Sequence, residues 1–320
     1  MHNLDSFLSS LSIGSPSSID ALSVYPLLRT PGGAPFYDTL SDAVRAGTLH
    51  ITEVSAAGSV PELRVVNDGK RPVLIIDGEE LIGAKQNRIV NLTVLVPEST
   101  TIPLPVTCVE SGRWRHVSDE FAPAERAHYA SGRRSKLSQV SMSMVAGSRL
   151  SDQSAVWAEI ADKSERFGAR SPTAAAGAMY DQRRDVLDRM IASIRPLDSQ
   201  VGAIFVIRGM IAGLDVFDHP RTWAQSMPKL LRSYGLDALD KGIGGDGFAT
   251  PDPSRFLGAI SQATCTAYPA VGAGRDLRFE GHGIIGAALD TKDGVVHAVA
   301  FPAADVVRPT RGWRFPRPIM

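Results

Sequence analysis

Short apolar runs separated by turn signals fill residues 48 to 110, and they constrain the fold more than any other feature. Turn residues such as Asn67-Asp68-Gly69 separate the runs, and no long helical pattern lies between them. The β-type runs are Leu49–Val54, Leu63–Val66, Val73–Ile76 and Leu92–Val96. Several antiparallel strands without long helices between them predict a sandwich or a partly open barrel.

A further strand is indicated by the alternation of apolar side chains from Ile102 through Leu104 and Val106 to Cys108. Pro103 and Pro105 interrupt this alternation. Because proline has no N–H to donate to a neighbouring strand, the pattern predicts a strand at the edge of its sheet.

Helical spacing becomes clear only in the second half of the chain. Residues 111–150 read as a long polar connection with one short helix near Pro123–Tyr129. Helices are predicted after Ser151, from Ser171-Pro172 through Ile194, after Asp218-His219-Pro220, and after Asp252-Pro253. Strands are predicted at Val201–Ile207, in a run ending near Phe217, and near 264–268, 275–279, 283–289 and 295–301.

The expected fold class is α+β, with an antiparallel β-rich N-terminal half packed against a mixed α/β C-terminal half. Residues 1–20 are rich in Ser, and we expect a loosely ordered segment there. Residues 21–130 form the expected β-rich region, which carries the polar motifs. Residues 131–320 supply the helices and the C-terminal strands, and the two regions could form one continuous domain.

Composition excludes several classes of protein. Among 320 residues there are 34 basic and 34 acidic side chains, so no net charge attracts the chain to nucleic acid or to an anionic membrane. No signal peptide and no transmembrane run is apparent, which predicts a cytoplasmic protein. The two cysteines, Cys108 and Cys265, are expected to be reduced thiols. A homo-oligomer is compatible with these properties.

Two polar blocks interrupt the predicted strands. The first runs from Asp77 to Arg88, and the second from Glu110 to Trp114. Burying such groups without partners costs several kcal/mol each, as an order-of-magnitude estimate, so they form either a solvated rim or a mutually satisfied polar site. If they form a site, we expect the two blocks to lie side by side.

Glu79, Glu80 and Glu110 are the candidate catalytic residues, because a carboxylate held by a neighbouring cation can act as a general acid or base. Adjacent strand residues point to opposite faces, so one of Glu79 and Glu80 is expected to face inward and the other outward. The alternative is a structural ion pair that fixes the turn.

The candidate ligand-binding residues carry many donors or a flat ring. They are Lys85, Gln86, Asn87, Arg88, Arg113 and Trp114. An arginine binds a phosphate or a carboxylate through two parallel hydrogen bonds, and a tryptophan can stack on a base. A solvated loop or a Trp that caps a sandwich would account for the same residues. The histidine spacings match no metal site, no metal site is predicted, and any cofactor stays unknown.

The chain resembles a little-characterised, mainly prokaryotic family, the ADP-ribosylglycohydrolase- and rhodanese-phosphatase-associated protein domain. The resemblance rests on Gly78-Glu79-Glu80-Leu81, Gly83-Ala84-Lys85-Gln86-Asn87-Arg88 and Val106–Trp114, and extends to Val216-Phe217, Pro228–Tyr234 and Val296–Phe301. It covers about residues 20 to 305. The family name reflects gene neighbourhoods with enzymes of ADP-ribose and phosphate-ester chemistry, so it implies a context and not a reaction.

Together these observations favour an intracellular protein that binds a small, anionic, nucleotide-derived ligand such as an ADP-ribose-like compound. It could be a hydrolase or transferase acting at a phosphoester or glycosidic centre. The alternative is a non-catalytic scaffold or accessory subunit whose polar motifs are structural.

Overall fold

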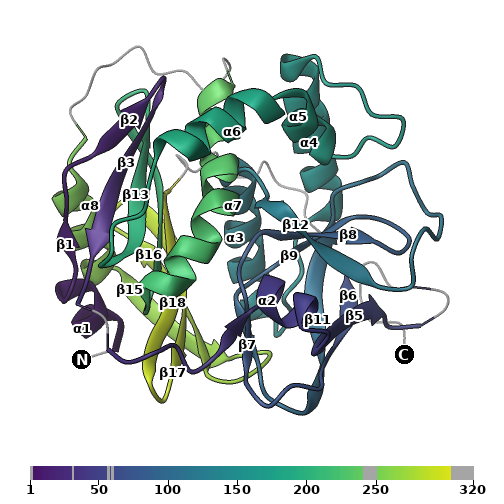
Figure 1. Cartoon of the computed structure of the whole chain (residues 1–320), viewed down its shortest axis with the longest axis horizontal. Coiled ribbons are helices and arrows are strands. Elements are labelled where there is room, and N and C mark those ends of the chain that lie inside the picture. Colours follow the sequence, from purple (N-terminus) through teal and green to yellow (C-terminus); the bar gives the residue numbers. More distant parts are fainter. Residues whose placement is uncertain (1–2, 31, 56–57, 59–60, 241–250, 304–320) are drawn as a thin grey trace.

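The computed structural model describes residues 3–30, 32–55, 58, 61–240 and 251–303 (Figure 1). It confirms the α+β class, with helices set among mostly antiparallel sheets. A nine-stranded sheet lies on the left in Figure 1, and the strands of a six-stranded sheet lie on the right. Helices α7 (Pro220–Leu239) and α3 (Ala130–Val145) run between these two groups of strands.

The nine-stranded sheet has the order β1-β3-β13-β14-β18-β17-β16-β15, with β2 paired to β3. Its strands are β1 (Ser12–Ile13), β2 (Ser17–Ile19), β3 (Leu22–Leu28), β13 (Gln200–Ile207), β14 (Met210–Phe217), β15 (Thr264–Pro269), β16 (Arg275–Gly281), β17 (Ile284–Thr291) and β18 (Gly294–Pro302). All its described pairings are antiparallel. Strand β3 therefore joins the N-terminal region to the C-terminal sheet.

The N-terminal half contains two further sheets, with the orders β12-β8-β9-β11-β6-β5 and β10-β7-β4. Their strands are β4 (Asp38–Thr39), β5 (Leu49–Glu53), β6 (Glu62–Asn67), β7 (Val73–Ile75), β8 (Glu79–Gly83), β9 (Arg88–Val90), β10 (Val94–Val96), β11 (Thr100–Cys108) and β12 (Phe121–Ala127). The pairing of β4 with β7 is parallel.

The remaining helices lie around these sheets. They are α1 (Asn3–Ser9), α2 (Leu40–Arg45), α4 (Gln153–Phe167), α5 (Gly177–Gln182), α6 (Arg184–Ser193) and α8 (Pro253–Gln262). Helix α4 begins at an Asp152 N-cap and ends at Gly168 in the left-handed region, and helix α7 begins with Pro220 after a His219 N-cap.

The nine-stranded sheet is covered on both faces, which explains the continuous apolar run of β13. Phe205 packs into a core that includes Trp223 of α7, whereas its neighbour Ile204 packs into a core that includes Phe7 of α1. Adjacent strand residues point to opposite faces, so both must be apolar when both faces are buried.

The structure corrects three expectations about local structure. The short helix near Pro123–Tyr129 is instead strand β12, which pairs with β8. The segment 1–20 is not loosely attached where it is described, because Leu4, Phe7 and Leu8 of α1 are buried. The helix α3 lies inside the stretch expected to be a polar connection.

Strand β11 lies between β9 and β6 in the sheet order, but the part that carries Pro103 and Pro105 pairs with β6 alone, as the edge prediction requires. Residues Thr100–Pro105 pair with β6 and residues Val106–Cys108 pair with β9, so the strand has two neighbours in succession. The N–H of Val106 donates to Pro61 on the β6 side at 2.9 Å. Because N–H directions alternate along a strand, Pro103 and Pro105 stand where the missing N–H would point away from β6.

Candidate functional site

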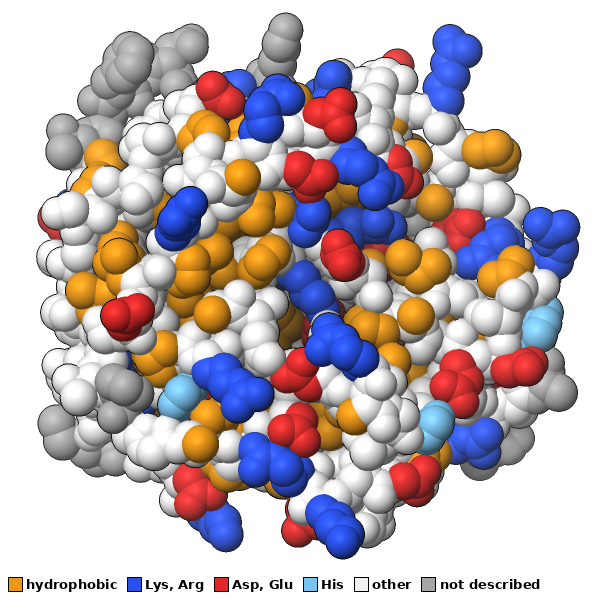
Figure 2. Space-filling model, in the orientation of Figure 1, with side chains coloured by type: hydrophobic (Ala, Val, Ile, Leu, Met, Phe, Trp, Pro, Cys, Tyr) orange, Lys and Arg blue, Asp and Glu red, His pale blue; other side chains and the backbone are white. Residues whose placement is uncertain are grey.

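A cleft of about 550 Å³ opens between α2 and α7. Figure 2 shows a hollow near the centre of this face, with basic and acidic side chains around it. Its lining comes from α2, β7, β8, α6 and α7, so both halves of the chain contribute to it. Ligand sites of proteins typically measure about 300–1,000 Å³, and this cleft falls within that range.

Glu79 and Lys229 form an ion pair in the wall of the cleft. The Lys229 ammonium donates to Glu79 Oε1 and, at 2.9 Å, to Ser41 Oγ. The second carboxylate oxygen of Glu79 accepts the backbone N–H of Ile76 at 3.2 Å. Glu79 and Lys229 are largely buried, but both of them and Ser41 line the cleft.

Gly78 fixes the turn that delivers Glu79 to this position. Its φ of +77° lies in the left-handed region, and a Cβ there would stand 2.7 Å from the Cδ of Arg133. Glycine is the one residue without a Cβ, so this close approach requires it. The next residue then enters β8 with its carboxylate directed at Lys229.

Polar contacts bridge α2 and α7 at the cleft. Gln225 donates to Asp42 Oδ2 at 2.6 Å, and Arg45 donates to Asp42 Oδ1 at 2.9 Å. Arg232 lies three residues after Lys229 on α7 and donates to the backbone oxygen of Glu125 at 3.0 Å. Lys229, Arg45 and Arg232 therefore line one cleft from two helices.

Glu80 does not line this cleft. It is fully buried, and the Nε and Nη2 atoms of Arg126 bind its two oxygens at 2.6 and 2.8 Å. The Arg126 guanidinium also stacks over the ring of Tyr180. The expectation that one of Glu79 and Glu80 faces outward is wrong, since both faces of β8 are covered at these residues. Glu80 forms the structural ion pair that was the alternative.

The two polar blocks lie side by side, as expected, but the joined part starts at Gly83 and not at Glu79. Asn87 N–H donates to Glu110 Oε2 at 3.1 Å, and Gln86 Nε2 donates to the Glu110 backbone oxygen at 3.0 Å. Arg113 binds Glu110 Oε2 at 2.6 Å and the Ala84 backbone oxygen at 3.0 Å. Most polar groups of this cluster are thus paired within the protein.

Trp114 covers the end of this polar cluster. Its ring lies 5.3 Å from Lys85 Nζ and 5.8 Å from the Arg88 guanidinium carbon, and half of the side chain is exposed. Arg88 is fully buried and donates to Gln86 Oε1 at 2.8 Å. None of these residues lines the α2–α7 cleft, so the predicted acid–base group Glu79 and the predicted stacking residue are separated.

Acidification tests the cluster around Glu110. Although burial raises its pKa, hydrogen bonds from Arg113, Thr173 and Asn87 outweigh burial and hold it below the ordinary value of 4.5. A carboxyl group whose pKa is lower in the folded state stabilises the protein at pH values above its unfolded-state pKa. This stabilisation is lost as the pH falls through the folded-state pKa. We expect Glu110→Gln to be less stable than wild type at neutral pH, with the difference shrinking below pH 4.5 in urea unfolding. An unchanged difference at low pH would contradict this assignment.

Cys108 is buried against polar neighbours as well as apolar ones. It faces Arg88 across the β9–β11 pair, and Gln153 of α4 bonds its backbone N–H and C=O. Burial raises the pKa of the thiol, so the reactive thiolate is scarce at neutral pH.

We therefore expect Cys108→Ala to lower the free energy of unfolding by about 1 kcal/mol or more through lost volume. In the native protein, thiol reagents should label Cys108 slowly, and the half-exposed Cys265 provides the internal comparison. Rapid labelling of Cys108 before unfolding would overturn this interpretation.

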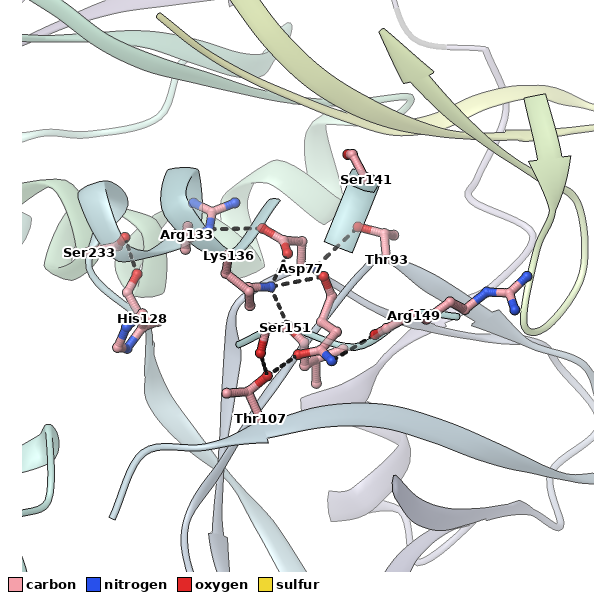
Figure 3. A network of polar contacts seen from close by, with 12 residues as sticks. Asp77, Thr93, Thr107, His128, Arg133, Lys136, Ser141, Arg149, Ser151 and Ser233 are labelled. Carbon is pink, nitrogen blue, oxygen red and sulfur yellow. Dashed lines mark hydrogen bonds and ion pairs between the residues drawn. The ribbon is translucent and has the colours of Figure 1, made fainter. Parts of the chain in front are cut away.

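A buried charge network around Asp77, Arg133 and Lys136 joins the two halves of the chain (Figure 3). Arg133 of α3 binds Asp215 of β14 at 2.6 and 3.0 Å, and Asp77 through its Nε atom at 3.3 Å. Lys136, one turn later, contacts Asp77 and donates to the Val90 and Asn91 backbone oxygens. The network is enclosed, so its role is to hold Asp77 and hence the Gly78 turn.

Sequence reasoning missed Lys229 as a site residue. In the sequence, the residue stands only inside the Pro228–Tyr234 block of the family resemblance and in the helix predicted after Pro220. The signal was present, because a lysine next to the proline interrupts the apolar face of that helix. In the part of the chain that the structure describes, no cluster of His, Cys, Asp and Glu could hold a metal ion. Among the same residues, no helix is long and apolar enough to cross a membrane.

Comparisons with known proteins give one match. A family model described as the ARG and Rhodanese-Phosphatase-superfamily-associated Protein domain matches residues 10–301. No curated protein and no solved structure matches the chain.

Proposed function

The chain belongs to the ARG and Rhodanese-Phosphatase-superfamily-associated Protein domain family, and from this premise we propose that it binds a small anionic ligand in the α2–α7 cleft. The ligand class that we propose is nucleotide-derived, such as an ADP-ribose-like compound. The observation that carries the proposal is the Glu79–Lys229 pair in the wall of the 550 Å³ cleft.

Lys229 and the apolar walls of the cleft offer contacts to such a ligand. Lys229 can turn its ammonium toward a phosphate, because an ammonium has three donors and only Glu79 and Ser41 use them among the described residues. Apolar side chains in the lining offer a surface to a flat ring. They are Leu40, Leu74, Ile76, Ile191 and Pro228.

If the protein is an enzyme, Glu79 is the acid or base that we propose, in hydrolysis or transfer at a phosphoester or glycosidic centre. Of the candidate carboxylates from the sequence, it is the one that lines the cleft. Glu80 and Glu110 are held by Arg126 and Arg113 instead. The proposal places the protein in the cytoplasm, where the free thiols Cys108 and Cys265 stay reduced.

Thermal unfolding with and without ligands tests the proposal. ADP-ribose, ADP, AMP and ribose 5-phosphate should be compared at equal concentration, because a ligand that binds only the folded state raises the melting temperature. We expect at least one of them to stabilise the wild type. The Trp114→Ala variant should respond as the wild type does, since Trp114 lies outside the cleft. If no compound shifts the wild type, the ligand class is wrong.

A further inference from the structure

A second, smaller pocket adjoins the α2–α7 cleft. It has a volume of about 60 Å³, and its lining comes from β12, α5, α6 and α7. Glu125 of β12 and Arg232 of α7 line both the pocket and the cleft, so the two spaces are adjacent. A single water needs about 10–15 Å³ of such space, and the pocket therefore has room for about four to six water-sized atoms.

Arg126 is held in the wall of this pocket with donors to spare. Its Nε and Nη2 atoms bind the two oxygens of the buried Glu80, and its guanidinium stacks over the ring of Tyr180. Its Nη1 atom has no hydrogen-bond partner among the described residues and is not one of their enclosed polar atoms. The pair with Glu80 thus fixes the guanidinium, while Nη1 keeps N–H groups for a group in the pocket.

Arg184 and Arg232 complete the cationic side of the pocket. Arg232 donates to the Glu125 backbone oxygen at 3.0 Å and to Asp188 at 2.7 Å, and Arg184 pairs with Asp181 at 2.7 Å. A guanidinium has five N–H donors, so both keep donors beyond these contacts. Together with Arg126, the lining has three guanidiniums against two carboxylates, those of Glu125 and Asp181.

We propose that this pocket binds a second phosphate of the ligand, so that the ligand carries a diphosphate; this inference rests on the proposed function. Lys229 and Arg232 are three residues apart on α7 and are therefore neighbours on one face of the helix. One phosphate would contact Lys229 in the cleft, and the next would lie beyond Arg232, between Arg126 and Arg184. Because guanidiniums bind phosphate oxygens through paired N–H groups, the lining favours a phosphate over a neutral group. The ligand class narrows from an anion to a nucleoside diphosphate.

Titration calorimetry with ADP and AMP, without divalent cations, tests this inference. Arg184→Met should weaken ADP about 10-fold, as expected for one lost charged hydrogen bond, and should change the affinity for AMP much less. Arg189→Met removes the same charge from an exposed position of α6 outside the pocket lining, so it is the matched control and should leave both affinities unchanged. Arg184 is more than half exposed, so its replacement should leave the fold intact.

Asp181→Asn provides a test of opposite sign. It removes a negative charge from the pocket and releases Arg184, so it should strengthen ADP about 2- to 5-fold, the range of an exposed ion pair. Asp185→Asn removes an exposed carboxylate of α6 outside the lining and should have no such effect.

Equal changes for ADP and AMP, no change for ADP, or an equal loss of ADP affinity in Arg189→Met would overturn the second phosphate position while leaving the proposed function standing. If neither nucleotide binds the wild type, this inference fails. The proposed function fails with it only if ADP-ribose does not bind either.

Discussion

Replacing Arg133 with methionine should lower the free energy of unfolding by about 3–5 kcal/mol, the cost typical of breaking a buried ion pair. Arg133 is fully buried and binds both oxygens of Asp215, which is also fully buried. Tyr234 and His297 contact Asp215 too, but only a cation offsets its full charge. Methionine keeps most of the volume, so the loss reports on charge and hydrogen bonds rather than on a cavity.

Urea unfolding of Arg133→Met and of Arg184→Met gives the comparison. Arg184 pairs with Asp181 on the surface, with both side chains more than half exposed, and such pairs contribute about 0–1 kcal/mol. A loss below about 1 kcal/mol in Arg133→Met would show that the network does not hold the two halves together.

Replacing Lys229 with methionine should weaken the binding of the anionic ligand about 10- to 100-fold, which corresponds to the loss of a hydrogen bond from a charged donor. The same change leaves the Glu79 carboxylate buried without its cation. We therefore also expect a loss of stability, and that loss could by itself reduce binding.

The double variant Glu79→Gln/Lys229→Met separates the two effects. It removes the uncompensated carboxylate, so it should regain much of the stability. Its affinity should stay low, because the ammonium is still missing. Recovery of wild-type affinity in the double variant would show that Lys229 acts only as the structural partner of Glu79.

The sequence predicted local structure well where an element has an apolar run or a clear start signal. The strand predicted at Val201–Ile207 is β13, and the helix predicted after Pro220 is α7. It failed for α3, because the buried face of that helix carries Arg133 and Lys136 and so shows no apolar periodicity. A helix that buries paired charges looks like a solvated segment until its partners are known.

The sequence predicted one contact of the candidate residues and missed another. The contact between Asn87 and Glu110 follows from two polar blocks at the ends of neighbouring strands, and the sequence indicated it. The contact between Glu79 and Lys229 joins residues 150 positions apart. No period or motif encodes such a pairing, because it depends on how α7 packs against β13 of the nine-stranded sheet and against β12, the neighbour of β8.

A crystal structure of the protein with ADP-ribose tests the central claim most directly. The account predicts ligand density in the cleft between α2 and α7, with a phosphate oxygen in hydrogen-bond contact with Lys229 and the ring against its apolar wall. Density over Trp114 and Arg88, with the cleft holding only solvent, would contradict it.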